Sequence, residues 1–259
     1  MKKFLKLLVV AVLSITTVFG LTACGDSNTL YVYTEAGFAP FEYMNGTEIV
    51  GVDVEIAKAI AKKLDMKLEV RNTNFDLITE AVKKSPENTI GIAGMTIREI
   101  DGITFSDPYF TSQQYILAKR GTFASTNGES AIDILDGKKI GVQLSTTGHT
   151  LVNDMKEDGT LGASTEIKTN AKYDFLAQQL EAGAIDAMVM DEQPAKSFLN
   201  KYNDLEIIKI TGVEVESYGI AVASSATDLL EAINEALAGI SPEQIQQWVD
   251  YHNEASSNA

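Results

Sequence analysis

The sequence contains few of the residues on which disulfides, metal centres and nucleic-acid interfaces depend. Its 259 residues include one cysteine and two histidines, which excludes a disulfide within the chain and a zinc site built from several thiolates. Basic residues are also scarce, since 21 Lys and Arg accompany 36 Asp and Glu, for a formal net charge of −15. A chain this acidic is repelled by phosphate backbones, so nucleic acid is not an expected partner.

Sequence signatures of common catalytic and cofactor sites are also missing. The chain shows no Ser/His/Asp order, no P-loop and no dinucleotide glycine fingerprint. His149 and His252 are isolated from carboxylates at ligand spacing, so they do not predict a metal site. We therefore expect no catalytic residues, no metal and no cofactor.

What remains is an ordinary folded composition with an unusual N-terminus. Hydrophobic residues make up 45% and charged residues 22% of the chain, which is typical of one large domain or two modest lobes. The first residues carry three lysines, Lys2, Lys3 and Lys6, followed by an apolar run over 7–21. This run is shorter than the ~20 residues of a membrane-spanning helix and typical of a secretory signal, although an N-terminal membrane anchor is the alternative.

The only cysteine follows this apolar run directly. The string Leu21-Thr22-Ala23-Cys24-Gly25 resembles a bacterial lipobox, in which the cysteine is lipidated before cleavage ahead of it. The resemblance implies a lipoprotein signal peptide over 1–23, a lipidated Cys24 and a polar leash over 24–28. Cleavage would remove three lysines and no acid, so the formal net charge of the exported chain becomes −18. We expect an extracytoplasmic protein held by acyl chains on the outer face of the cytoplasmic membrane, or facing the periplasm.

Beyond the leash, short apolar strands alternate with amphipathic helices, which is typical of an α/β fold. Strands are expected at residues 29–34, 67–71, 89–93, 139–142, 166–169, 185–190, 205–210 and 218–223. Helices are expected near 54–64, 76–83, 150–155, 171–181, 194–202 and 227–237, with a last one starting after the cap signal at Ser241-Pro242.

The elements form two successive series separated by a polar loop at 121–130. Two series predict two lobes, and chain crossings between them are expected near 112–115 and 215–218. The first lobe would then comprise 29–113 plus 218–259, and the second 114–217.

Several strings, in this order along the chain, resemble one family: the extracytoplasmic solute-binding proteins (family 3) of polar amino-acid ABC transporters. They are Thr34-Glu35-Ala36-Gly37-Phe38-Ala39-Pro40-Phe41, Gly51-Val52-Asp53, Phe75-Asp76, Gly91-Ile92-Ala93-Gly94-Met95-Thr96, Phe105-Ser106-Asp107-Pro108-Tyr109, Leu135-Asp136-Gly137-Lys138-Lys139-Ile140-Gly141-Val142-Gln143, Ser145-Thr146-Thr147-Gly148, Gly183-Ala184-Ile185-Asp186-Ala187 and Tyr218-Gly219-Ile220-Ala221-Val222. The resemblance implies a two-lobed periplasmic-binding-protein type II fold, in which each lobe is a mixed sheet flanked by helices and hinge strands join the lobes.

A free amino acid presents an ammonium and a carboxylate, and burying both requires charge-assisted partners. Asp191 follows a buried strand, where ligands bind in α/β sheets, and the resemblance implies that it holds the α-ammonium group. The alternative is an aspartate that caps the following helix. Thr146, Thr147 and Gly148 precede a helix and predict a carboxylate site, although an ordinary turn is the alternative.

The resemblance implies further contacts from both lobes. Thr96 and the backbone at Ala93 and Gly94 would bind the carboxylate from the first lobe, and Gln143 belongs to the matched motif of the second. Phe38 and Phe75 match aromatic walls of the family's site, although each is alternatively a core residue. Glu35 matches a position that often carries an acid touching the ammonium or the ligand side chain.

One departure from the family concerns the carboxylate clamp. The family usually has an arginine five residues after the threonine of the Gly-Met-Thr motif, whereas here the segment between Thr96 and Phe105 looks two residues short and its only arginine is Arg98. Either the loop is rebuilt so that Arg98 reaches the site, which we favour because an unpaired buried carboxylate is costly, or the clamp is weakened and the ligand differs.

The sequence therefore predicts a lipid-anchored, monomeric receptor that binds a polar L-amino acid and delivers it to an ABC permease with its ATPase subunits. Two alternatives stay open at this point: an enzyme on the same fold, such as a dehydratase of a cyclic acid, with Glu35 or His149 as its acid or base, and a sensory receptor without transport.

Overall fold

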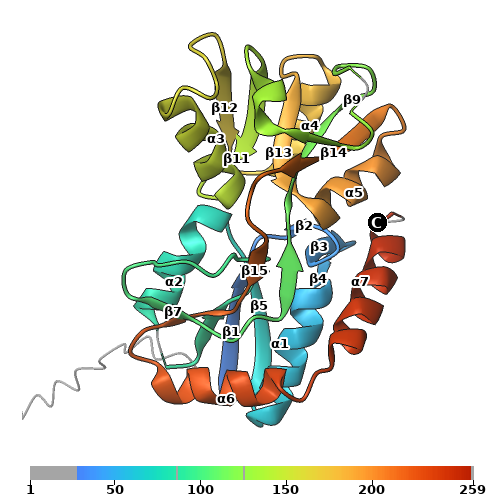
Figure 1. The fold of residues 1–259 in the computed structure, drawn as a ribbon. Helices are drawn as coiled ribbons and strands as arrows, with labels where there is room; N and C mark the ends of the chain where they lie inside the picture. Colours follow the sequence, from blue (N-terminus) through green and yellow to red (C-terminus); the bar gives the residue numbers. More distant parts are fainter. Residues whose placement is uncertain (1–27, 86, 125, 258–259) are drawn as a thin grey trace, which may run out of the picture.

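The computed structural model describes residues 28–85, 87–124 and 126–257, which form two lobes (Figure 1). The expected signal peptide and Cys24 lie outside the described residues. Within the described residues, no helix combines the length and the hydropathy that crossing a membrane requires.

The first lobe is built on a five-stranded sheet with the order β5-β1-β6-β16-β7. β1 pairs in parallel with β5 and β6, whereas β16 runs antiparallel to its neighbours. The strands are β1 (Thr29–Thr34), β5 (Lys67–Asn72), β6 (Thr89–Gly91), β7 (Ile103–Phe105) and β16 (Ala221–Ala223). The helices are α1 (Val52–Lys63), α2 (Ile78–Lys84), α6 (Thr227–Leu237) and α7 (Pro242–Ser256), with a 3₁₀ turn η1 (Phe75–Leu77). A small sheet of β2 (Gly37–Phe38), β3 (Glu42–Asn45) and β4 (Glu48–Val50) lies at the side that faces the second lobe.

The second lobe is built on a six-stranded mixed sheet with the order β10-β14-β9-β13-β11-β12. Its strands are β9 (Gln114–Lys119), β10 (Glu129–Ala131), β11 (Lys139–Gln143), β12 (Glu166–Asn170), β13 (Ala187–Asp191) and β14 (Leu205–Thr211). The helices are α3 (Thr147–Glu157), α4 (Tyr173–Glu181) and α5 (Glu192–Lys201), with a 3₁₀ turn η2 (Ile132–Leu135).

Two short antiparallel strands, β8 (Phe110–Ser112) and β15 (Glu216–Tyr218), lie where the chain passes between the lobes (Figure 1). The strand expected at 218–223 is divided here. Tyr218 pairs with Phe110 in β8, whereas Ala221 pairs with Phe105 in β7. The strand changes partner between them because Gly219 donates its N–H to Met95 instead, at 2.9 Å.

Local sequence explains where two helices begin. α3 starts at Thr147, three residues earlier than predicted, because the Thr146 hydroxyl accepts the N–H of His149 and caps the helix. α7 starts as predicted, since Ser241 accepts the N–H of Gln244 and proline occupies the first helical position.

Candidate ligand-binding cleft

A cavity lies between the lobes and is lined by residues of both. The empty space between the lining side chains, including its opening to solvent, is about 480 Å³, within the usual range for small-ligand sites. The lining residues are Glu35, Phe38, Glu42, Phe75, Ala93, Gly94, Met95, Thr96, Arg98, Ile100, Phe105, Gln143, Ser145, Thr146, Thr147, Tyr173 and Asp191. Every residue of the predicted site except Gly148 is among them.

Asp191 ends β13 with its carboxylate in the cavity, buried to 6% exposure. It accepts hydrogen bonds from the Gln114 amide and the Tyr218 hydroxyl. Burial, and to a lesser degree the negative charge of Glu216, raise the pKa of Asp191 to about 7. The residue directly precedes α5, but its side chain accepts no hydrogen bond from that helix, so it does not act as the helix cap.

The Thr146-Thr147-Gly148 segment combines structural and cavity-facing roles. Thr146 caps α3 and donates its hydroxyl to the Gln143 carbonyl at 2.8 Å. Thr147 directs its hydroxyl to Glu216, also at 2.8 Å. Gly148 lies beneath the surface instead, where a Cβ atom would come within 2.8 Å of Gln114 Oε1, so its part is to let α3 approach β9.

The segment around Gly94 supplies the contribution of the first lobe. Gly94 adopts a φ of 52° and donates its N–H to Asp53 Oδ2 at 2.8 Å. Tyr109 donates its hydroxyl to the same oxygen at 3.1 Å. Burial raises the pKa of Asp53 to about 6, against the lowering effect of these donors. Asp53 therefore holds the backbone that carries the cavity residues Gly94 and Thr96.

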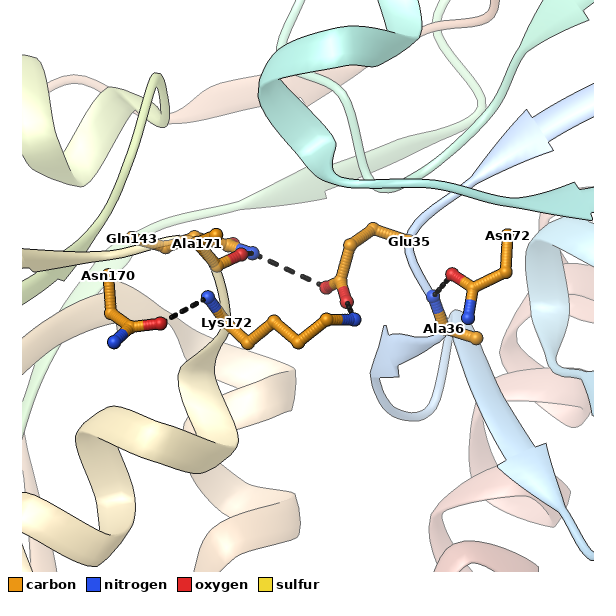
Figure 2. Close-up of polar contacts among 7 residues, drawn as sticks. All are labelled: Glu35, Ala36, Asn72, Gln143, Asn170, Ala171 and Lys172. Carbon is orange, nitrogen blue, oxygen red and sulfur yellow. Dashed lines mark hydrogen bonds and ion pairs between the residues drawn. The ribbon is translucent and has the colours of Figure 1, made fainter.

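Glu35 connects the two lobes (Figure 2). Its carboxylate, with 2% of the side chain exposed, accepts Lys172 Nζ at 2.9 Å and Gln143 Nε2 at 3.3 Å, both from the second lobe. Asn72 and Asn170 accept the N–H groups of Ala36 and Lys172, which orders the segments on each side. Burial raises the pKa of Glu35, and Lys172 opposes this rise.

The aromatic residues serve both packing and the cavity wall. Phe38 is buried at 7% exposure, and its ring centroid lies 5.8 Å from that of Tyr173 in the other lobe. Phe75 is half-buried in η1. Both line the cavity. Phe38 is therefore a core residue and part of the cavity wall at the same time.

Arg98 reaches the cavity despite the shortened loop. Its side chain lines the site and its guanidinium donates to the Ser145 carbonyl of the second lobe at 2.8 Å. This placement is the one expected if the loop is rebuilt so that Arg98 reaches the site.

The sequence analysis did not predict several residues that lie in or next to the cavity. Lys172, Glu216 and Gln114 stand in ordinary polar contexts, and only their tertiary partners distinguish them. Asp53 ends the matched string Gly51-Val52-Asp53, but no role was predicted for it, and Glu42 offers only a weak signal, as an acid between two aromatic residues. Burial and neighbouring Asp53 raise the pKa of Glu42 well above its usual value.

Two lobes joined by paired crossing strands, with charged and aromatic groups from both around one cavity, define a small-molecule binding protein. The model of the family "Bacterial extracellular solute-binding proteins, family 3" matches residues 30–252. The chain belongs to this family, which confirms the predicted membership and the two-lobed α/β fold.

Individual relatives agree with this assignment. The arginine-binding extracellular protein ArtP of Bacillus subtilis (strain 168) is 32% identical over 251 residues, 92% of each chain. The amino-acid ABC transporter substrate-binding protein AbpA of Streptococcus pneumoniae, solved with L-arginine, matches with a TM-score of 0.78 at 27% identity, over 89% of this chain and 96% of that one. An ancestral arginine-binding protein bound to arginine matches with a TM-score of 0.75 at 36% identity, over 85% and 98%.

These relatives are binding proteins, so the chain is an amino-acid solute-binding protein and not an enzyme. The prediction of a non-catalytic, extracytoplasmic protein is confirmed, and the dehydratase alternative is removed.

Proposed function

We propose that this chain is the receptor of an ABC importer, that it binds a polar L-amino acid with a cationic side chain, and that L-arginine is its first candidate ligand. The observation that carries the proposal is the charge of the cavity wall. Three carboxyl groups, those of Glu35, Glu42 and Asp191, line it against two cations, Arg98 in the wall and Lys172, which pairs with Glu35. A ligand with two cationic groups and one carboxylate complements this balance. Several relatives are named as arginine-binding proteins or were solved with L-arginine, which agrees with this proposal.

Each end of such a ligand has a partner of suitable chemistry. Asp191 would bind the α-ammonium, because its carboxylate is buried among neutral donors. Arg98, with the hydroxyls of Thr96 and Thr147, would bind the α-carboxylate. Phe38 and Phe75 would flank the side chain, whose guanidinium interacts favourably with aromatic faces.

Contacts from both lobes would favour the closed arrangement, which a permease can distinguish from an open one. We propose the lobes 29–113 plus 218–259 and 114–217, with β8 and β15 as the hinge. We further propose a monomer attached to the membrane through a lipidated Cys24, after removal of 1–23.

Isothermal titration calorimetry with L-arginine, L-histidine, L-glutamine and L-cystine tests the ligand class. We expect the tightest binding with L-arginine and a loss of at least about 100-fold in Asp191→Asn, since an ionised partner is removed from a buried pair. Asp154→Asn, an exposed carboxylate on α3, should bind like the unaltered protein. Tightest binding of L-glutamine would overturn the cationic ligand, and no binding of any amino acid would overturn the function.

Closure and delivery need separate measurements. Small-angle X-ray scattering should show a smaller radius of gyration with saturating ligand, and an unchanged radius would contradict closure. Cells lacking the gene should lose uptake of the radiolabelled ligand, whereas unchanged uptake would favour a sensory role.

A further inference from the structure

A carboxylate of the chain itself, that of Glu216, contacts the hydroxyls that the proposed function assigns to the ligand's carboxylate. Glu216 Oε2 accepts Thr96 Oγ1 at 2.6 Å and Thr147 Oγ1 at 2.8 Å. Its other oxygen accepts Gln114 Nε2 at 3.1 Å. Three donors from separate parts of the fold therefore converge on this one side chain.

The position of Glu216 in the fold makes this contact specific. It begins β15, one of the crossing strands, while Thr96 belongs to the first lobe and Thr147 begins α3 in the second. The same two threonines line the cavity, and together with Glu216 they also border an open groove whose empty space, including its opening to solvent, is about 1030 Å³. The Glu216 side chain thus separates cavity from groove and has space on the groove side into which it can turn.

We infer that Glu216 is an affinity-setting residue of the binding site: its carboxylate competes with the α-carboxylate of the bound amino acid for the hydroxyls of Thr96 and Thr147. This inference rests on the proposed function. Two carboxylates repel each other at hydrogen-bond distances from one donor pair, so the ligand must displace Glu216 toward the groove. Arg98, whose guanidinium bonds the Ser145 carbonyl, then provides the charge that makes the exchange favourable.

A pair of ligands that differ only in the carboxylate isolates this competition. Agmatine is arginine without its carboxylate, and Glu216→Gln keeps the shape of the side chain while removing its charge. We expect Glu216→Gln to bind L-arginine about tenfold more tightly, as the loss of one charged hydrogen-bond competitor implies, and agmatine with little change. Glu157→Gln, an exposed acid at the end of α3 that borders neither the cavity nor the groove, is the matched control and should change neither affinity.

The titrations should be made at pH 8, because Glu216 contributes to the raised pKa of Asp191 and Asp191 must be ionised in both proteins. Equal changes for L-arginine and agmatine would overturn the inference, as would weaker binding of both, which would make Glu216 a direct partner of the ligand's cation. Binding of L-arginine by the unaltered protein with no change in Glu216→Gln would overturn the inference alone. Absence of binding by both proteins would overturn the inference and the proposed function together.

Discussion

The buried carboxylates of the cleft differ in their immediate neighbours, and those neighbours determine what each group can do. Asp191 meets only neutral donors, from Gln114 and Tyr218, so its charge is available to a ligand cation. Glu35 already contacts a lysine of the opposite lobe. Asp53 accepts a backbone N–H and a tyrosine hydroxyl, which makes it a positioning group for the cavity floor.

The pH dependence of binding should report Asp191. Its pKa of about 7 means that the unliganded carboxylate is protonated at lower pH, when it cannot pair with an ammonium. We expect affinity to be constant above pH 7 and to fall about tenfold per pH unit below it. Calorimetry in Asp191→Asn should show weak binding without this dependence, and an unchanged profile in that variant would exclude Asp191 as its origin.

Removing the guanidinium of Arg98 should weaken binding of the ligand's carboxylate. We expect Arg98→Ala to lose at least about 2 kcal/mol of binding free energy, roughly 30-fold in Kd, because a charged partner is removed. Arg120→Ala, which alters an exposed arginine beyond β9, is the control for the loss of a positive charge. Unchanged calorimetric affinity in Arg98→Ala would show that the shortened loop has lost the clamp.

At the scale of an element, the segment that follows β6 shows how backbone conformation places the site. Gly94 has a positive φ, and a Cβ atom there would lie 2.5 Å from Phe38 Cε1 and 3.4 Å from Tyr218 Cε2. Only glycine therefore allows the cavity floor to lie directly against the aromatic wall.

Two glycine substitutions separate the contact from the backbone strain. Gly94→Ala and Gly121→Ala both place alanine at a positive φ, but Gly121 has no atom within 4 Å of the added Cβ. We expect Gly121→Ala to cost about 1 kcal/mol of unfolding free energy and Gly94→Ala at least about 1 kcal/mol more, with weakened ligand binding. Urea denaturation measures both, and equal costs would show that Phe38 moves aside freely.

At the scale of the whole molecule, buried acids are concentrated where the lobes meet. The pKa values of Glu35, Glu42, Asp53 and Asp191 are all raised by burial. These four groups therefore bind more protons in the folded chain than in the unfolded chain from about pH 4 up to about pH 7. Its formal net charge of −15 adds repulsion in the same direction.

Stability without ligand should therefore decrease as pH rises through this window. We expect a thermal midpoint higher at pH 5 than at pH 8 at constant ionic strength, by several degrees. Glu42→Gln should flatten the decline because it removes one of the buried titrating groups. A midpoint that rises from pH 5 to pH 8 would contradict the assigned direction of these pKa shifts.

Prediction from sequence was most successful for elements whose signals are local. The strand at 29–34 and the cap at Ser241 follow from alternation and capping chemistry, and the structure has both. The prediction of a single strand over 218–223 was wrong. The strand is divided at Gly219, whose N–H bonds to Met95, a residue distant in sequence. The order of the motifs identified the family, and eleven of the residues implied by the resemblance line one cavity.

The sequence by itself determined the α/β class, the family and the residue types of the cleft, because periodicity, capping and motif order are carried by neighbouring residues. Only the tertiary structure decided which charges meet. Glu35 and Lys172 are 137 positions apart, and Thr96 and Glu216 are 120 positions apart. Their pairing depends on how two separately built lobes and the crossing strands come together, and local sequence patterns carry no information about that packing.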